Sequence, residues 1–194
     1  MVPNRTPTRG RPLSSAPRSP VRRFGQWAII LAAVAGVYAY AESGQRSPLL
    51  GKPAPELNLW VVAGGEQGQP PKRLGLSDLR DRVTVLEFWA SWCGACQRTT
   101  PMLNELSAEF ANDGVSFFAV NVEPSTESAV VAAHESIGAA FPTLHDRSGQ
   151  VHQAYAVRAL PTVVVIGRDG LISYSSSGMP SQSRLRKEIS AAID

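Results

Sequence analysis

Apolar residues in the C-terminal three quarters of the chain follow two spacings, one typical of buried strands and one typical of helices. Residues 83–88 form a nearly continuous β-prone run, as expected of a strand that is buried on both faces. Residues 93–112 then place Leu103, Leu106 and Phe110 on one helical stripe. The change of period predicts a central strand that leads directly into a helix.

The rest of this region continues the alternation of strands and helices. Residues 162–166 and 171–174 flank Gly167-Arg168-Asp169-Gly170, which predicts a β-hairpin. The order predicts an α/β fold, a mixed sheet with helices on both faces. The other expected elements are strands at 57–62, 115–122 and 141–144, a loop at 64–71, a short helical turn at 76–79, a helix at 125–137 ended by Gly138, and a closing helix at 181–193.

The N-terminal part of the chain has a different composition. Residues 1–23 are rich in Pro, Arg, Ser and Thr and have no apolar period, which predicts a disordered basic leader. Residues 24–41 are uncharged and mostly apolar. As a helix they would span about 27 Å, near the lower limit for crossing a bilayer. Arginines precede this stretch and almost none follow it, which predicts a cytoplasmic N-terminus and an exported C-terminal part.

Two interpretations of residues 24–41 remain open. An uncleaved signal anchor would make the protein single-pass in the cytoplasmic membrane, with its domain in the periplasm or an equivalent extracytoplasmic space. A cleavable signal peptide is the alternative, because Ala39-Tyr40-Ala41 fits a small-residue cleavage site. Cleavage after Ala41 would leave a soluble periplasmic protein. Both interpretations export residues 42–194, with a linker at 42–50 and the domain at 51–194.

The formal net charge of +3 belongs to the leader rather than to the domain. Residues 1–23 contain six arginines and no acidic residue, which leaves 13 basic against 16 acidic residues in the remainder. A mildly acidic domain behind a basic tail gives little support to nucleic-acid binding. We therefore expect no nucleic-acid partner.

The two cysteines of the chain lie between the predicted central strand and its helix, as Trp92-Cys93-Gly94-Ala95-Cys96. A C-x-x-C in this position is typical of a dithiol redox centre. A helix N-terminus favours the thiolate, so Cys93 is expected to present an exposed, reactive sulfur. Cys96 lies one turn later and is expected to be more buried, where it can resolve a mixed disulfide.

Two other uses of the cysteines are less well supported. A purely structural disulfide would close only a four-residue loop and constrain little of the unfolded chain. A metal site would need two more ligands, and none of the three histidines forms a metal-like pair with the cysteines. We therefore expect no metal and no cofactor other than the Cys93–Cys96 disulfide itself.

Glu87 is a charged residue inside the predicted buried strand, six residues before Cys93. Burial of an unpaired carboxylate should raise its pKa, and such a group can exchange a proton with Cys96. A solvated glutamate at a sheet edge is the alternative. Pro161, directly before a predicted strand, either marks the strand start or forms a cis peptide bond.

Together these residues resemble the thioredoxin superfamily, and the wider chain looks like its TlpA/ResA-like branch of membrane-anchored thiol-disulfide oxidoreductases. The resemblance covers roughly residues 51–193, the whole predicted domain. The residues that carry it are 88–96, Pro101, Pro161, 51–57, 76–79, 155–157, 160–162 and 169–170.

The resemblance implies a role for each of several residues. Cys93 would be the attacking thiol and Cys96 the resolving thiol, with Glu87 in the place of the buried acid of thioredoxins. Pro161 would be a cis-proline facing the active site, and the backbone of Leu160 would pair with an extended substrate segment.

Residues around the first cysteine would form the remaining substrate-binding surface. Trp92 would shape the surface beside Cys93, next to Gly94 and Ala95. Many relatives have proline where this chain has Ala95. Residues between the cysteines tune the redox potential, so this departure leaves the potential open within the family range of about −270 to −120 mV.

The expected function is the reduction or exchange of disulfides in exported proteins. The expected clients include apocytochrome c, and a membrane electron donor of the thiol-reductase type would regenerate the dithiol. One alternative is a non-catalytic redox sensor or thiol-dependent binding module, which turnover of a disulfide substrate would distinguish. Another is a peroxiredoxin, whose Pro-x-x-x-Thr-x-x-Cys motif is absent around Cys93.

Overall fold

The computed structural model describes residues 27–34, 36, 47–65 and 72–194. The chain divides into two compact units, Met1–Gly44 and Gln45–Asp194. In the first unit the described residues are helical, and no described helix is both long and apolar enough to cross a bilayer. The predicted leader at 1–23, the cleavage site at 39–41, and residues 42–46 and 66–71 lie outside the described residues.

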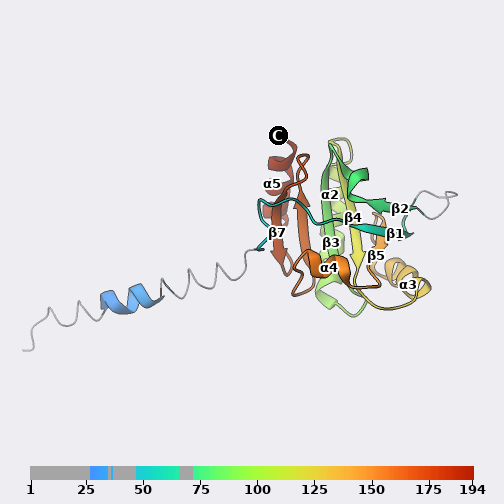
Figure 1. Ribbon diagram of the computed structural model, residues 1–194. Coiled ribbons are helices and arrows are strands. Elements are labelled where there is room, and N and C mark those ends of the chain that lie inside the picture. The colour runs from blue at the N-terminus through green and yellow to red at the C-terminus, as the bar shows by residue number, and fades with distance from the viewer. Residues whose placement is uncertain (1–26, 35, 37–46, 66–71) are drawn as a thin grey trace, which may run out of the picture. The chain divides into compact units, whose positions relative to one another are not determined.

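The second unit is built on a seven-stranded sheet in the order β2-β1-β5-β4-β3-β6-β7 (Figure 1). β3 pairs in parallel with β4 and antiparallel with β6, so the sheet is mixed, as the sequence predicts. The strands are β1 (Asn58–Ala63), β2 (Arg73–Gly75), β3 (Val83–Trp89), β4 (Val115–Asn121), β5 (Thr143–His145), β6 (Thr162–Ile166) and β7 (Ile172–Ser177).

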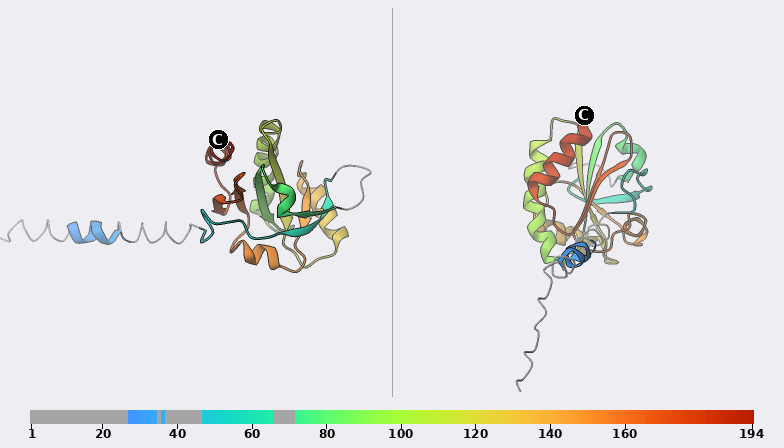
Figure 2. Two further views of the ribbon diagram at one scale, coloured as in Figure 1. Left: turned by 45° about the horizontal axis from the view of Figure 1, so that its top comes forward. Right: turned by 90° about the vertical axis from the view of Figure 1, so that its left-hand side faces the viewer.

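Helices cover both faces of this sheet. α2 and α5 lie side by side on one face (Figure 2), joined at their surface by an ion pair between Arg186 and Glu109 at 2.8 Å. α4 covers the other face and contributes Val151 to the core there. The helices are α2 (Gly94–Glu109), α3 (Glu127–Ile137), α4 (Gln150–Ala154), α5 (Gln182–Ile193) and the short 3-10 helix η1 (Leu76–Leu79).

β3 is the central element of the domain, and all seven of its side chains are buried. Successive side chains of a strand point to opposite faces, so β3 contributes to two separate cores. Val85 and Trp89 pack with α2 and α5. Leu86 and Phe88 pack on the opposite face with Tyr155, which follows α4.

The chain enters the domain along the outer strand β7. Pro53 pairs with Leu171, and the amide of Gly51 donates to the carbonyl of Ile172 at 2.8 Å. The amide of Ile172 in turn donates to the carbonyl of Lys52 at 2.9 Å. Part of the β7 edge is therefore covered by the segment that leads into the sheet.

Two elements were not predicted from the sequence. β2 has only three residues and forms by pairing with β1, where Leu59 lies opposite Leu74. α4 has only five residues, and the carboxylate of Asp146 accepts hydrogen bonds from the amides of Val151 and His152 in its first turn. β2 therefore depends on a neighbouring strand and α4 on the carboxylate of Asp146, rather than on a local apolar period.

Candidate active site

The turn between β3 and α2 holds both cysteines. β3 ends at Trp89, and the amide of Cys93 donates to the carbonyl of Ala90 at 3.1 Å to close the turn. Cys93 is the N-cap residue of α2, and its Sγ accepts a hydrogen bond from the Cys96 amide at 3.1 Å. A sulfur in this position accepts hydrogen bonds from the unpaired backbone amides of the first helical turn, and these bonds stabilise a thiolate.

Cys93 and Cys96 form a disulfide, with their Cα atoms 5.3 Å apart. Cys96 is completely buried and Cys93 is 6% exposed, so Cys96 is the more buried of the two, as expected. The expectation of an exposed Cys93 sulfur is wrong for this oxidised state, because the residue packs into the core beneath α2. The neighbouring Trp92 is 71% exposed and carries the accessible surface beside the disulfide.

Glu87 lies in the interior of the sheet, paired between Ala119 of β4 and Val163 of β6. Its side chain is fully buried, and neither carboxyl oxygen has a hydrogen-bond partner among the described residues. Burial raises the pKa of Glu87 to about 8. The alternative of a solvated edge glutamate is therefore wrong.

Strand alternation places Glu87 on the same face of β3 as Val85 and Trp89, the face that packs against α2. The indole Nε1 of Trp89 is also buried without a partner within the described part of the chain. The core on this face therefore contains the disulfide, an acid held mainly protonated at neutral pH and an unpaired donor. Buried unpaired polar atoms are uncommon in folded proteins and often accompany function.

Pro161 is buried at the start of β6, and the Leu160–Pro161 peptide bond is cis. Its carbonyl accepts a hydrogen bond from the Gly178 amide at 2.8 Å. Leu160 is half-buried and packs against the core that contains both cysteines. Ala95 packs there as well, whereas Gly94 is exposed. The structure thus brings the predicted substrate-binding residues and the disulfide into one region.

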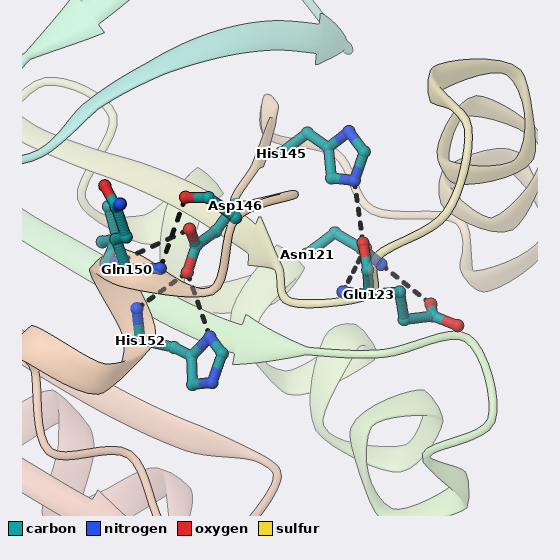
Figure 3. Close-up of polar contacts among 8 residues, drawn as sticks. Asn121, Glu123, His145, Asp146, Gln150 and His152 are labelled. Atoms are coloured by element: carbon teal, nitrogen blue, oxygen red, sulfur yellow. Dashed lines mark hydrogen bonds and ion pairs between the residues drawn. The ribbon is translucent and has the colours of Figure 1, made fainter.

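A polar cluster beside the turn was not identified from the sequence (Figure 3). The Glu123 carboxylate accepts hydrogen bonds from the Ser91 amide at 2.7 Å and from the Ser91 hydroxyl at 2.9 Å. Asn121 and His145 hold Glu123 from the other side. The signal that could have located Glu123 is its position after β4, because parallel strands such as β3 and β4 end at the same sheet edge.

Within residues 27–34, 36, 47–65 and 72–194, no group of three or more His, Cys, Asp or Glu side chains is arranged to hold a metal ion. Buried Asp146 and partly exposed His152, 3.0 Å apart between Oδ2 and Nδ1, form a pair at the first turn of α4.

Known proteins share this arrangement over most of their length. The thiol-disulfide oxidoreductase ResA of Geobacillus thermodenitrificans is 31% identical over 164 residues, which cover 83% of this chain and 89% of that protein. A Chlorobium tepidum structure assigned as the thiol:disulfide interchange protein DsbE is 31% identical, with a TM-score of 0.65 over 75% of this chain and 98% of that one.

A third similarity concerns the fold alone. The structure of a secreted Mycobacterium tuberculosis disulfide oxidoreductase homologous to Escherichia coli DsbE is 22% identical, with a TM-score of 0.57 over 70% of this chain and 95% of that one. The Redoxin family profile matches residues 49–192, which include the whole sheet and the disulfide. The chain therefore belongs to the Redoxin family and is a TlpA/ResA-like thiol-disulfide oxidoreductase of the thioredoxin superfamily.

Proposed function

We propose that the protein reduces or exchanges disulfides of exported proteins through the Cys93–Cys96 pair. The observation that carries this proposal is the placement of Cys93 as the N-cap of α2, with Cys96 buried one turn later and Glu87 on the same face of the sheet. This arrangement provides an attacking sulfur, a resolving sulfur and an acid in one region.

In the proposed reaction, the Cys93 thiolate attacks one sulfur of a client disulfide. The client disulfide breaks, its second sulfur leaves as a thiolate, and a mixed disulfide joins Cys93 to the client. The Cys96 thiol then loses its proton and attacks Cys93 Sγ, which releases the client as a dithiol. The client gains two electrons and two protons, and the protein is left with the Cys93–Cys96 disulfide.

Glu87 is the proposed acceptor of the Cys96 proton. Because its pKa is raised to about 8, the carboxyl is mainly protonated at neutral pH and half-ionised near pH 8, so its ionised fraction can accept a proton and its protonated fraction can return one. Its ionised form would also disfavour a second negative charge on a nearby buried sulfur. This effect supports a reducing rather than a strongly oxidising pair.

Leu160 is the proposed docking point for the client backbone. Neither its amide nor its carbonyl has a hydrogen-bond partner among the described residues, although it lies directly before β6. An extended client segment could therefore pair with Leu160 as an added strand next to the disulfide. The exposed indole of Trp92, with Gly94 and Ala95, would contact the same client.

The proposed clients include apocytochrome c, whose haem-attachment cysteines must be reduced before haem is joined to them. The oxidised pair would be reduced again by a membrane electron donor of the thiol-reductase type. The proposed export of the domain rests on the sequence of residues 24–41. We propose that these residues are a signal anchor, or a signal peptide cleaved after Ala41.

Trapping tests the exchange mechanism most directly. Cys96→Ser should accumulate mixed disulfides with clients on Cys93, because the resolving sulfur is missing. The double variant Cys93→Ser/Cys96→Ser is the matched control and should trap nothing. Insulin, which contains disulfides, is the test substrate. Failure of Cys96→Ser to form any mixed disulfide with insulin would overturn the mechanism. Absence of insulin turnover by the wild type would favour a redox sensor.

Fractionation of expressing cells tests the location. The anchor proposal predicts the full-length chain in the membrane fraction. A protein trimmed to begin at Glu42 and recovered in the periplasmic fraction would replace the anchor with the cleaved form. Recovery of the full-length chain in the cytoplasmic fraction would overturn both.

A further inference from the structure

The active-site turn is tied to a carboxylate from the neighbouring strand. Ser91 lies two residues before Cys93, and Glu123 accepts from both its amide (2.7 Å, at Oε2) and its hydroxyl (2.9 Å, at Oε1). Gln97 in the first turns of α2 donates to the Ser91 carbonyl at 3.4 Å. Ser91 is therefore held between the end of β4 and the start of α2.

Glu123 is itself fixed in place (Figure 3). The side-chain amide of Asn121 donates to Glu123 Oε2 at 3.1 Å, and the Glu123 amide donates to Asn121 Oδ1 at 3.0 Å. His145 Nε2 lies 2.9 Å from the Glu123 carbonyl oxygen. Asn121 is completely buried and His145 is 7% exposed, so this support is part of the rigid sheet edge rather than a surface contact.

The carboxylate of Glu123 is ionised under ordinary conditions. Partial burial works against ionisation, but hydrogen bonds from the Ser91 amide, the Asn121 side chain and the Ser91 hydroxyl, with the charge of His145, outweigh it and lower the pKa of Glu123. All three donors favour the charged form of the acid.

A fixed negative charge beside the turn has a predictable effect on Cys93. Two residues of backbone, the Cys93 side chain and a 2.7 Å hydrogen bond place the carboxylate within about 13 Å of Cys93 Sγ. At about 13 Å, with an effective dielectric constant between that of water and that of a protein surface, a unit charge changes an equilibrium constant about two- to ninefold. The charge opposes the stabilisation that the α2 N-terminus gives to the Cys93 thiolate.

We propose that Glu123 is a positioning residue for thiol-disulfide exchange: it fixes Ser91 and thereby the turn that presents Cys93, and its charge destabilises the Cys93 thiolate and keeps the pair more reducing. The proposal rests on the proposed role of Cys93 as the attacking sulfur. It adds a device outside the Cys-x-x-Cys motif that sets how the attacking sulfur is held and how strongly the pair donates electrons.

Three variants separate the positioning effect from the charge effect. Glu123→Gln can still accept a hydrogen bond from the Ser91 amide and donate one to the Ser91 hydroxyl, so it removes the charge and keeps both hydrogen bonds to Ser91. Glu123→Ala removes both. Ser91→Ala removes one hydrogen bond and keeps the charge. Asp113→Asn is the matched charge control, because Asp113 is exposed and lies beyond the opposite end of α2.

The first measurement is the equilibrium of the Cys93–Cys96 disulfide with glutathione at pH 7. Glu123→Gln should shift the equilibrium constant about fivefold toward the dithiol, which corresponds to about 20 mV. Alkylation of Cys93 by iodoacetamide should show the same change as a pH profile moved to lower pH. Asp113→Asn and Ser91→Ala should remain within about twofold of the wild type.

The second measurement is hydrogen exchange of the Ser91 amide. Glu123→Ala should exchange this amide at least about tenfold faster than the wild type, because its acceptor is gone, while Glu123→Gln should retain protection. An unchanged glutathione equilibrium in Glu123→Gln overturns the charge effect, and unchanged Ser91 exchange in Glu123→Ala overturns the positioning effect. Neither measurement needs a client, so lack of client turnover would count against the proposed function alone.

Discussion

The two faces of β3 bury the same strand with different chemistry. The face toward α4 packs Leu86 and Phe88 with Tyr155, whose hydroxyl donates to the Pro55 carbonyl at 2.8 Å. The face toward α2 contains Glu87 and Trp89, whose buried polar atoms have no partner among the described residues. Both faces are equally inaccessible to solvent, so burial alone does not distinguish them.

The difference shows how one sheet separates stability from reactivity. Paired polar groups and close apolar contacts stabilise the fold, and the α4 face supplies both around Tyr155. The hydroxyl of Thr84 on this face is also buried without a partner among the described residues, but it carries no charge at any ordinary pH. Unpaired buried groups cost stability but hold a carboxyl at an unusual pKa. The buried acid with the unusual pKa lies on the face with the cysteines, where we propose that it takes part in thiol chemistry.

The largest expected effect is the loss of activity in Cys93→Ser. Without the attacking sulfur, the rate of disulfide exchange should fall at least about a thousandfold. The unfolding free energy of the reduced variant should stay within about 1 kcal/mol of that of the reduced wild type, since the serine side chain is only slightly smaller than that of cysteine. Insulin turnover and urea unfolding check both halves. Substantial residual turnover would mean that Cys96 can attack, which contradicts the division of roles.

Phe88→Ala tests the opposite face. Removal of this buried ring should lower the unfolding free energy by about 3–5 kcal/mol, because it leaves a cavity against Tyr155. The glutathione equilibrium of the folded variant should stay within about threefold of the wild type. A small loss of stability with a large shift in that equilibrium would reverse the proposed division between the faces.

Glu87→Gln should change stability in a pH-dependent way. The folded-state pKa of Glu87, about 8, lies above the ordinary value of 4.5, so wild-type stability is highest below pH 4.5 and falls as the pH rises toward 8. Between pH 5 and pH 8 the variant should gain roughly 3 to 4 kcal/mol relative to the wild type. Urea unfolding of the oxidised proteins at both pH values measures this difference.

The same variant tests the proton-transfer role. The pH profile of insulin reduction should lose the component that reflects Glu87, and the rate should fall. Glu56→Gln, the same change at an exposed position, is the matched control for both measurements. Superimposable profiles of the wild type and Glu87→Gln would refute the role of Glu87 in catalysis.

The smallest effect is expected for Tyr155→Phe. Loss of the hydrogen bond to Pro55 should cost about 1 kcal/mol. Burial, followed by the charge of Glu56, raises the pKa of Tyr155, so the hydroxyl stays neutral and the cost should be constant from pH 5 to pH 9. Urea unfolding across this range checks the prediction. A strongly pH-dependent cost would show that the α4 face also contains a titrating group.

Much of the fold was predictable because the most deeply buried elements have the longest apolar patterns in the sequence. Residues 83–88 and the helical stripe of Leu103, Leu106 and Phe110 lie in β3 and in or directly after α2. Gly138 ends α3 in the left-handed conformation, as its position indicated. Short elements such as β2 and α4 were missed because three or five residues are too few to show an apolar period.

The residues of the candidate site also differ in whether the local sequence marks them. Cys93, Cys96 and Glu87 could be selected as candidates from the sequence because each is unusual in its local context, as a cysteine pair at a helix start and an acid in an apolar run. Glu123 was missed because a glutamate after a strand is ordinary until the strand order places it beside Ser91. Its proposed role depends on β3 and β4 being parallel neighbours, which no local pattern indicates.

The segment that pairs with the β7 edge has a consequence for association between chains. An uncovered outer strand presents free amides and carbonyls that can recruit a strand from another molecule. Here both backbone groups of Ile172 are occupied by Gly51 and Lys52 of the same chain. Residues 51–53 thus block pairing of another chain with this part of β7. Truncation past Lys52 would expose this edge to intermolecular pairing.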